Sequence, residues 1–250
     1  MKNIVFSWFL LFTTIMLAQT PKELFTKGNE FYKNGNYLKA IDSYKSIKEQ
    51  GLQSDGLFLN LGNCYYKLNK VAPAIYYYEK ALKLNPENEK AKTNLTFANR
   101  MTIDAIDELP KTFLQKLSEN IIQKFSFDTW AIIAVVASFL VAIFFLLYYF
   151  SFSSTKKLMY FNTSIISLVV LIITLFFAIE NYNYEQKNRT AIIFATKVEV
   201  KNAPSTSSND AFELHEGTKV IVLDELDNWK KIKIADGKTG WIFADYLKEI

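Results

Sequence analysis

NLGNCYYKLNKVAPAIYYYEKALKLNP, residues 60–86, decides the fold of the first half of this chain, because most of its pattern occurs twice. Residues 24–47, LFTKGNEFYKNGNYLKAIDSYKSI, align with residues 58–81, FLNLGNCYYKLNKVAPAIYYYEKA, which lie 34 positions later. Glycines, asparagines and aromatic residues match in this alignment, as at Gly28 and Gly62. A repeat of this length, with small residues among large rings, predicts pairs of antiparallel helices that stack on one another.

The repeat resembles the tetratricopeptide repeat in its period and in its residue types. The second copy carries nearly the whole pattern of that family, at Phe58, Leu61, Gly62, Tyr65, Ala74, Tyr78, Ala81 and Pro86. The first copy departs from it at Lys27, Ile47 and Leu52. The resemblance implies that Gly62 lies where two helices cross, so that Gly62→Leu would overpack them. It also places Tyr65 and Tyr78 in the core, and Cys64 is expected to be an apolar filler rather than a reactive thiol.

In this family the concave face, lined by the first helix of each repeat, binds peptides. Carried onto this chain, that face comprises Phe25, Asn29, Tyr32, Lys33, Leu59, Asn60, Asn63, Tyr66 and Lys67. Asn29 and Asn60 stand where family members that grip a peptide carboxylate have asparagines, but Phe25 replaces their lysine. We therefore expect a mixed aromatic and polar groove for a peptide, the alternative being a solvated face without a ligand. On this interpretation Asn63→Ala leaves folding nearly intact.

The residues after the repeats predict two further helices. Residues 88–100 resemble a capping helix whose Ala91, Leu95 and Ala98 cover the second repeat. Within residues 101–128, apolar residues recur at helical spacing opposite lysines, at Phe113, Leu114, Leu117, Ile121, Ile122 and Phe125. Such a helix either lies at a membrane interface or packs on the repeats.

Two long uncharged runs, residues 130–150 and 158–179, are each long enough to cross about 30 Å of hydrocarbon as a helix. The N-terminus has a basic start, an apolar stretch and a small residue at Ala18, which is the layout of a signal peptide, with an uncleaved anchor as the alternative. Lys156 and Lys157 lie between the two runs, so the positive-inside bias puts this turn in the cytoplasm and both soluble parts outside.

The tail changes to a period of two, with alternating pairs such as Val198 and Val200 separated by turn residues, which predicts five or six short strands and a small barrel. The order of landmarks, VEVKNAPS, then LHEGTKVIVLDE, then NWKKIKIADGKTGWIFADYL, resembles the bacterial SH3 (SH3b) family. That resemblance implies a groove that binds cell-wall peptides or protein segments. Its candidate residues, some of which could instead be barrel core, are Trp229, Trp241, Phe243 and Tyr246.

Composition argues against several other functions. Residues 19–128 have 16 basic and 13 acidic residues and residues 180–250 have 10 and 12, so neither part has the charge of a nucleic-acid-binding surface. Because Cys64 is the only cysteine, no internal disulfide or cysteine-based metal site can form. His215 is the only histidine and is expected at the surface. We expect no catalytic, metal or cofactor-binding residues.

The predicted fold class is a multidomain chain: an α-helical solenoid, a two-helix transmembrane hairpin and a small all-β SH3b barrel. The expected boundaries are a signal peptide (1–18), a repeat domain with its capping helix (19–100), an amphipathic juxtamembrane helix (101–128), transmembrane helices (129–150 and 158–179) around a cytoplasmic turn (151–157), a linker (180–190) and an SH3b domain (191–250).

This arrangement resembles the BatE-like proteins of the Bat aerotolerance operon. The resemblance implies a multi-pass protein of a bacterial cytoplasmic (inner) membrane, with both soluble domains on the periplasmic side. It also implies partners, namely membrane proteins with von Willebrand A domains and a MoxR-type ATPase. We expect a non-enzymatic envelope scaffold that binds protein partners, with peptidoglycan as the alternative ligand of the SH3b domain. The alternatives are a sensor that relays outside binding to the ATPase and, less favoured, an accessory of a cell-wall hydrolase.

Overall fold

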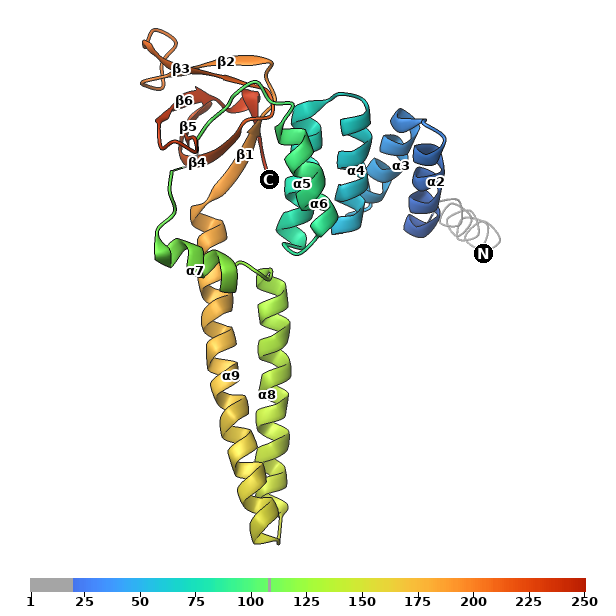
Figure 1. The fold of residues 1–250 in the computed structure, drawn as a ribbon, viewed down its shortest axis with the longest axis vertical. Coiled ribbons are helices and arrows are strands. Elements are labelled where there is room, and N and C mark those ends of the chain that lie inside the picture. Colours follow the sequence, from blue (N-terminus) through green and yellow to red (C-terminus); the bar gives the residue numbers. More distant parts are fainter. Residues whose placement is uncertain (1–19, 108) are drawn as a thin grey trace, which may run out of the picture.

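The computed structural model describes residues 20–107 and 109–250, so the expected signal peptide, residues 1–18, lies outside the described residues. Its N-terminal part is a stack of helices (Figure 1): α2 (Pro21–Lys33), α3 (Tyr37–Glu49), α4 (Asp55–Lys67), α5 (Val71–Leu84) and α6 (Glu89–Asn99). The hydroxyls of Thr20 and Ser54 and the side-chain carbonyl of Asn88 accept backbone hydrogen bonds at the starts of α2, α4 and α6. These caps define where the helices begin.

The two repeats share one packing device. A Cβ atom added to Gly62 would lie 2.5 Å from the ring of Tyr78, and one added to Gly28 would lie 2.5 Å from the ring of Tyr44. Both tyrosines are 1% exposed. The prediction that Gly62 lies at a helix crossing is therefore confirmed.

The segment after the repeats differs from its prediction. Of the expected helix over 101–128, only α7 (Phe113–Ile121) is a separate helix, and α8 already begins at Phe127. Residues 101–107 and 109–112, called the strap below, contain no helix and lie between α6 and α7. The apolar residues with helical spacing begin at Phe113, and Pro110 lies just before them, so a helix is expected to start only after this proline. Figure 1 shows α7 lying across one end of a long hairpin.

That hairpin consists of α8 (Phe127–Phe150) and α9 (Ser154–Lys187), which in the described residues are the two helices long and apolar enough to cross a membrane. Most of their large apolar side chains are exposed, whereas the buried residues of the two helices are mainly small. Aromatic pairs such as Trp130 and Phe177, with centroids 5.0 Å apart, also join the helices. The turn is shorter than expected, Ser151 to Ser153. The expected linker over 180–190 is also mostly helical, because α9 continues to Lys187.

The tail is an antiparallel all-β domain of strands β1 (Arg189–Ile193), β2 (Lys197–Lys201), β3 (Asp210–His215), β4 (Lys219–Leu226), β5 (Trp229–Lys233), β6 (Thr239–Phe243) and β7 (Leu247–Glu249). The strands are ordered β3-β2-β6-β5-β4-β1-β7 in one sheet. Inward residues alternate along them, so that Val200, Ile232 and Ile242 are buried. Strands β1 and β7 raise the number above the five or six expected.

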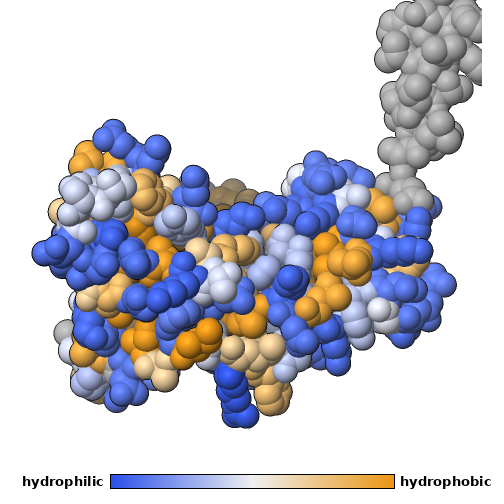
Figure 2. Space-filling view, turned by 90° about the horizontal axis from the view of Figure 1, so that it is seen from above, coloured by the Kyte–Doolittle hydropathy of each residue, from blue (hydrophilic) through white to orange (hydrophobic). Residues whose placement is uncertain are grey.

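The β domain packs against the repeats through α5. Ile192 of β1 is fully buried within the core of the repeats, and the ring of Phe194 lies 5.7 Å from that of Tyr76. Gly217, with a φ of +90°, brings the β3–β4 turn so close that a Cβ atom would lie 3.0 Å from Val71. Viewed from the side away from the hairpin, the two domains form one continuous surface (Figure 2).

The strap adds a polar connection to the same interface. The carboxylate of Asp104 accepts hydrogen bonds from the backbone N–H of His215 at 2.7 Å and from the hydroxyl of Thr218 at 2.6 Å. Its other oxygen lies 2.7 Å from Nδ1 of His215. His215 was expected at the surface, and this is wrong in part, because the strap covers it and leaves its side chain 24% exposed.

Candidate protein-binding surfaces

We call the side of the repeats formed by α2, α4 and α6 the concave face. The predicted groove residues lie on α2 and α4, and a hydrogen bond from Asn60 to Asn29 joins these two helices. The side chains of Lys33 and Lys67 are exposed, and the others are half-buried: Phe25, Asn29, Tyr32, Leu59, Asn60, Asn63 and Tyr66. Several of the apolar ones also pack against the core, as Phe25 does with its ring 5.7 Å from that of Tyr44. The face therefore offers a polar and aromatic surface on a firmly packed base.

A hollow of about 350 Å³ lies on this face between α4 and α6. It is lined by Leu59 and Asn63 from the predicted groove. Four residues of α6 that were not predicted as groove residues also line it: Glu89, Lys90, Thr93 and Asn94. The spacing of the asparagines could have predicted these residues. Asn94 follows Asn63 by 31 residues, as Asn60 follows Asn29, so α6 takes the place of the first helix of a third repeat.

The asparagines of the groove are also structural. Oδ1 of Asn63 accepts hydrogen bonds from the hydroxyl of Tyr78 at 2.9 Å and from Nδ2 of Asn94 at 2.7 Å. Asn29 repeats the arrangement with Tyr44 at 2.7 Å and Asn60 at 3.1 Å. This hydrogen bond argues against the expectation that Asn63→Ala leaves folding nearly intact, because that change would leave a buried hydroxyl without its acceptor. A ligand would meet the side-chain N–H groups of these amides instead.

Cys64 and the tyrosines beside it form the interior of the repeats. The Cys64 side chain is fully buried, and burial raises the pKa of its thiol to about 12. Burial likewise raises the pKa of Tyr77 to about 12, and the ring of Tyr77 stacks on that of Tyr65 at 5.5 Å. A thiol with so high a pKa is a poor nucleophile, which agrees with its interpretation as an apolar filler.

Three of the four rings predicted for the SH3b groove lie together. The rings of Trp229 and Phe243 are stacked with centroids 4.0 Å apart, and Tyr246 meets Phe243 edge-on at 6.0 Å. Trp241 lies two residues before Phe243 on β6, with the ammonium group of Lys231 6.0 Å from its ring. We call these four residues the aromatic row. None belongs to the buried core of the barrel, and Ile242 takes the inward position between Trp241 and Phe243.

Of the acidic residues beside the aromatic row, Glu225 is neutralised by ion pairs. Strand pairing sets Asp224 opposite Lys231 and Glu225 opposite Lys230. Glu225 also forms an ion pair with Arg189. Asp224 and Asp227 form no ion pair within 4.0 Å among the described residues, so this stretch keeps part of the negative charge that its sequence indicates.

Family models match two segments. Residues 57–88 match the tetratricopeptide repeat, and residues 196–248 match the bacterial SH3 domain. The chain therefore combines a tetratricopeptide repeat, two long apolar helices and a bacterial SH3 domain, and these two domain types are interaction modules.

Curated proteins match over about a third of the chain. It is 30% identical over 84 residues to tetratricopeptide repeat protein 16 of Homo sapiens, covering 32% of this chain and 10% of that protein. The Macaca fascicularis protein of the same name is 29% identical over 84 residues, with the same coverage. The human protein O-mannosyl-transferase TMTC1 is 31% identical over 77 residues, covering 31% of this chain and 9% of that protein. The chain thus spans about a tenth of the length of these relatives.

No group of three histidine, cysteine, aspartate or glutamate side chains that could hold a metal ion occurs within residues 20–107 and 109–250. The two surfaces described above present aromatic rings, amides and a few lysines. Such surfaces hold peptides or sugars by apolar contact and hydrogen bonds.

Proposed function

We propose that this chain is a non-enzymatic, membrane-anchored envelope scaffold that binds protein partners through its concave face and its aromatic row. One observation carries this proposal: both interaction domains are attached to the same end of the α8–α9 hairpin (Figure 1). If the hairpin crosses the membrane, both domains meet partners on the same side.

The sequence indicates the side of the membrane on which the two domains lie. The expected signal peptide exports the repeats, and Lys156 and Lys157 lie at the opposite end of the hairpin, where the positive-inside bias places the cytoplasm. We therefore propose a bacterial inner membrane with both domains on its periplasmic side.

The order of domains supports a place in a Bat-type aerotolerance complex, with von Willebrand A domain membrane proteins as partners. Acidic residues near Trp229 favour a basic protein partner over peptidoglycan, whose peptides carry carboxylates. Because Glu225 is already paired with Arg189 and Lys230, only Asp224 and Asp227 support that preference. Peptidoglycan is accordingly the competing ligand for the aromatic row, and experiment must compare the two.

Site-specific photocrosslinking in native membranes tests the scaffold directly. A photoreactive residue at Tyr66 samples the concave face and one at Trp229 samples the aromatic row, with Gln53 and Lys238 as exposed control positions. We expect defined protein adducts from Tyr66 and Trp229 that the control positions do not give. Adducts that are the same at all four positions, or none from the two surfaces, would contradict the proposal.

A pull-down of the full chain with insoluble peptidoglycan separates the two ligands of the aromatic row. We expect little retention at physiological salt, and the same for Trp229→Ala. Strong retention of the wild type that is lost in Trp229→Ala would assign the row to the cell wall.

A sensor is the second candidate, and one observation favours it. Helix α9 continues without a break from the hairpin to Lys187, and a single residue, Asn188, separates it from β1. A movement of the β domain would thus reach the hairpin without a flexible linker. The short turn, Ser151 to Ser153, offers little surface to an ATPase on the other side, which is why we place the scaffold first.

A further inference from the structure

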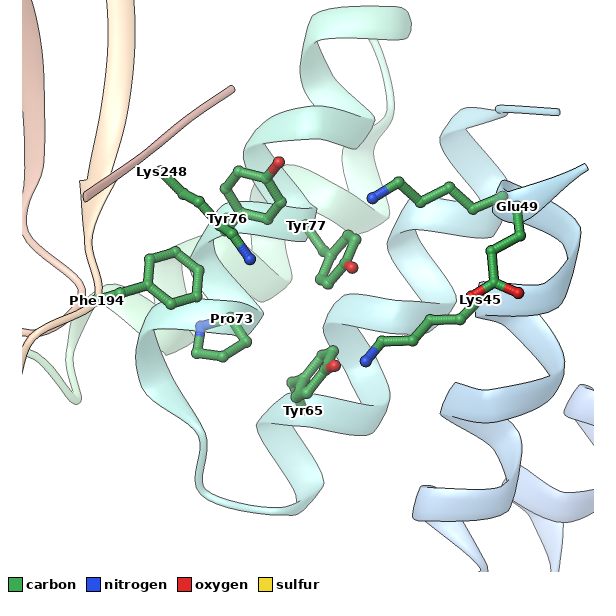
Figure 3. Close-up of a pocket in the computed structure, with 9 residues that line it drawn as sticks. Lys45, Glu49, Tyr65, Pro73, Tyr76, Tyr77, Phe194 and Lys248 are labelled. Atoms are coloured by element: carbon green, nitrogen blue, oxygen red, sulfur yellow. The ribbon is translucent and has the colours of Figure 1, made fainter. Parts of the chain in front are cut away.

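A second hollow lies at the junction of the two domains, on the side of the repeats opposite the concave face. It has a volume of about 340 Å³ and is lined by α3, α4 and α5 of the repeats and by the β1 and β7 ends of the barrel (Figure 3). We call it the junction pocket. Its volume is within the range of sites that hold small ligands or peptide side chains. It is distinct from both surfaces of the proposed function.

Aromatic side chains from both domains form one part of the junction pocket. Tyr76 of α5 meets Phe194, which follows β1, edge-on with centroids 5.7 Å apart. Tyr77 lies 5.2 Å from Tyr76 and stacks on Tyr65. These contacts hold the rings in place before any ligand arrives, so an apolar group could pack on them at little entropic cost.

The charges around the junction pocket are mainly positive. Lys45 and Lys48 come from α3 and Lys248 from β7, against one carboxylate, that of Glu49. Figure 3 shows Lys45 and Lys248 on opposite sides of the rings. The ammonium groups of these two lysines lie 6.0 Å from the ring of Tyr65 and 5.2 Å from the ring of Phe194, respectively.

These three lysines have no carboxylate partner, a property that they share with many exposed lysines of the described residues, but they are gathered around one pocket. Lys197, Lys219 and Lys230, by contrast, each form an ion pair with a glutamate. Among the described residues, Lys45, Lys48 and Lys248 form no such pair within 4.0 Å. Cations gathered at a partly enclosed aromatic surface attract an anion, because their field is less screened there than on an open surface.

We propose that the junction pocket binds an acidic peptide segment of a partner protein, whose carboxylates pair with Lys45, Lys48 and Lys248 while an apolar side chain packs on Tyr76 and Phe194. Charge complementarity selects this occupant, and the aromatic rings favour a peptide with neighbouring acidic and apolar residues over a simple anion. Because the repeats and the barrel each supply part of the pocket, the peptide binds the docked pair and stabilises it.

The test uses the full chain in nanodiscs of zwitterionic lipid, so that no anionic lipid competes. The probe is a fluorescent eight-residue peptide of alternating glutamate and leucine, with an alternating glutamine and leucine peptide for comparison. Binding is measured by fluorescence anisotropy at low and at physiological salt. We expect the glutamate peptide to bind more tightly than the glutamine peptide, and more weakly as salt rises.

Three variants locate the site. Lys45→Glu/Lys48→Glu changes the repeat side and Lys248→Glu changes the barrel side. Lys22→Glu/Lys39→Glu makes the same change of net charge on exposed lysines of α2 and α3 that do not line the pocket. We expect the double change at the pocket to weaken binding about tenfold or more, Lys248→Glu to weaken it less, and the control to leave it nearly unchanged.

Equal weakening by the control and by the pocket variant would overturn the proposal, because it would show attraction to net charge alone. So would lysine-dependent binding of soluble peptidoglycan fragments that is tighter than that of the glutamate peptide, since the site would then serve the cell wall. Neither result bears on photocrosslinking from Tyr66 or Trp229, so the failure of this inference is distinguishable from failure of the scaffold.

Discussion

At the scale of single residues, the repeats depend on a contact between a glycine and a tyrosine and on a hydrogen bond between that tyrosine and an asparagine. Because Gly62 has no side chain, the ring of Tyr78 fits against it, and Oδ1 of Asn63 accepts a hydrogen bond from the hydroxyl of Tyr78. Neighbouring residues of α4 thus hold both the face and the end of one buried side chain.

Replacing Gly62 with alanine should destabilise the repeats by about 1–3 kcal/mol, because the added Cβ atom would lie 2.5 Å from the Tyr78 ring. Gly56→Ala is the matched control on the same helix, since no atom lies within 4 Å of a Cβ atom there and alanine favours helix. Hydrogen exchange of the α4 and α5 amides in the full chain measures both changes. Faster exchange in Gly56→Ala than in Gly62→Ala would show that the register of the repeat is wrong.

Asn63→Ala should also destabilise the repeats, by about 1–3 kcal/mol, because the buried hydroxyl of Tyr78 loses its acceptor. Tyr78→Phe removes the hydroxyl itself, so adding it to Asn63→Ala should cost less than the sum of the two single changes. The same hydrogen-exchange measurement, read as a double-mutant cycle, gives the coupling between the two residues. Strict additivity would mean that the hydrogen bond contributes nothing.

At the scale of elements, the strap and α7 together connect the repeats to the α8–α9 hairpin. The strap binds the barrel through Asp104, and Leu109 donates its backbone N–H to Ala235. Helix α7 exposes Phe113, Leu117 and Ile121, which are spaced four residues apart along one face. The structure thus places α7 on the end of the hairpin rather than against the repeats, which agrees with an interfacial position.

The strap should loosen at low pH. Burial by itself raises the pKa of Asp104, but the hydrogen bonds from Thr218 and His215 outweigh it, so that its pKa lies below the ordinary value of 3.8. Because the folded-state pKa is lowered, the stabilisation is complete above about 3.8 and is lost as the pH falls below it. The protection factors of the 215–218 amides, which correct for the slower intrinsic exchange in acid, should therefore fall at low pH in the wild type. At neutral pH Asp104→Ala should already show the low protection factors, and factors equal to those of the wild type would contradict this role.

The exposed face of α7 should rest in lipid. A nitroxide at Leu117, in a chain whose Cys64 is replaced by alanine, should be relaxed more by oxygen, which concentrates in lipid, than by a water-soluble nickel complex. A nitroxide at Lys116, the residue just before Leu117 on the helix, should be relaxed more by the nickel complex than by oxygen. The same preference for the nickel complex at both positions would place α7 in water.

At the scale of the whole molecule, the sequence predicted the parts but not how they dock. The 34-residue period set the register at Gly62, and alternation of apolar residues found the central strands, because both signals are local and repeated. The interface of the repeats with the barrel carries no such signal. Ile192 and Phe194 have an ordinary strand pattern, and Asp104 lies 111 residues from His215.

The groove on the concave face could also be predicted only in part. Positions such as Asn29 and Asn60 follow from the match between repeats, whereas the part of the groove in α6 belongs to an incomplete third repeat whose remaining pattern is missing. The junction pocket could not be predicted at all, since it exists only where α3 and β7 come together.

The central claim is that one membrane hairpin holds both interaction domains on the outer side. Single cysteines at Asn34 in the repeats, Thr206 in the barrel and Lys157 at the start of α9, each in a chain with Cys64→Ala, report the side on which each part lies. A membrane-impermeant maleimide added to intact spheroplasts should label positions 34 and 206, and should label position 157 only after the membrane is lysed. Labelling of position 157 before lysis, or of only one of the other two, would contradict the account.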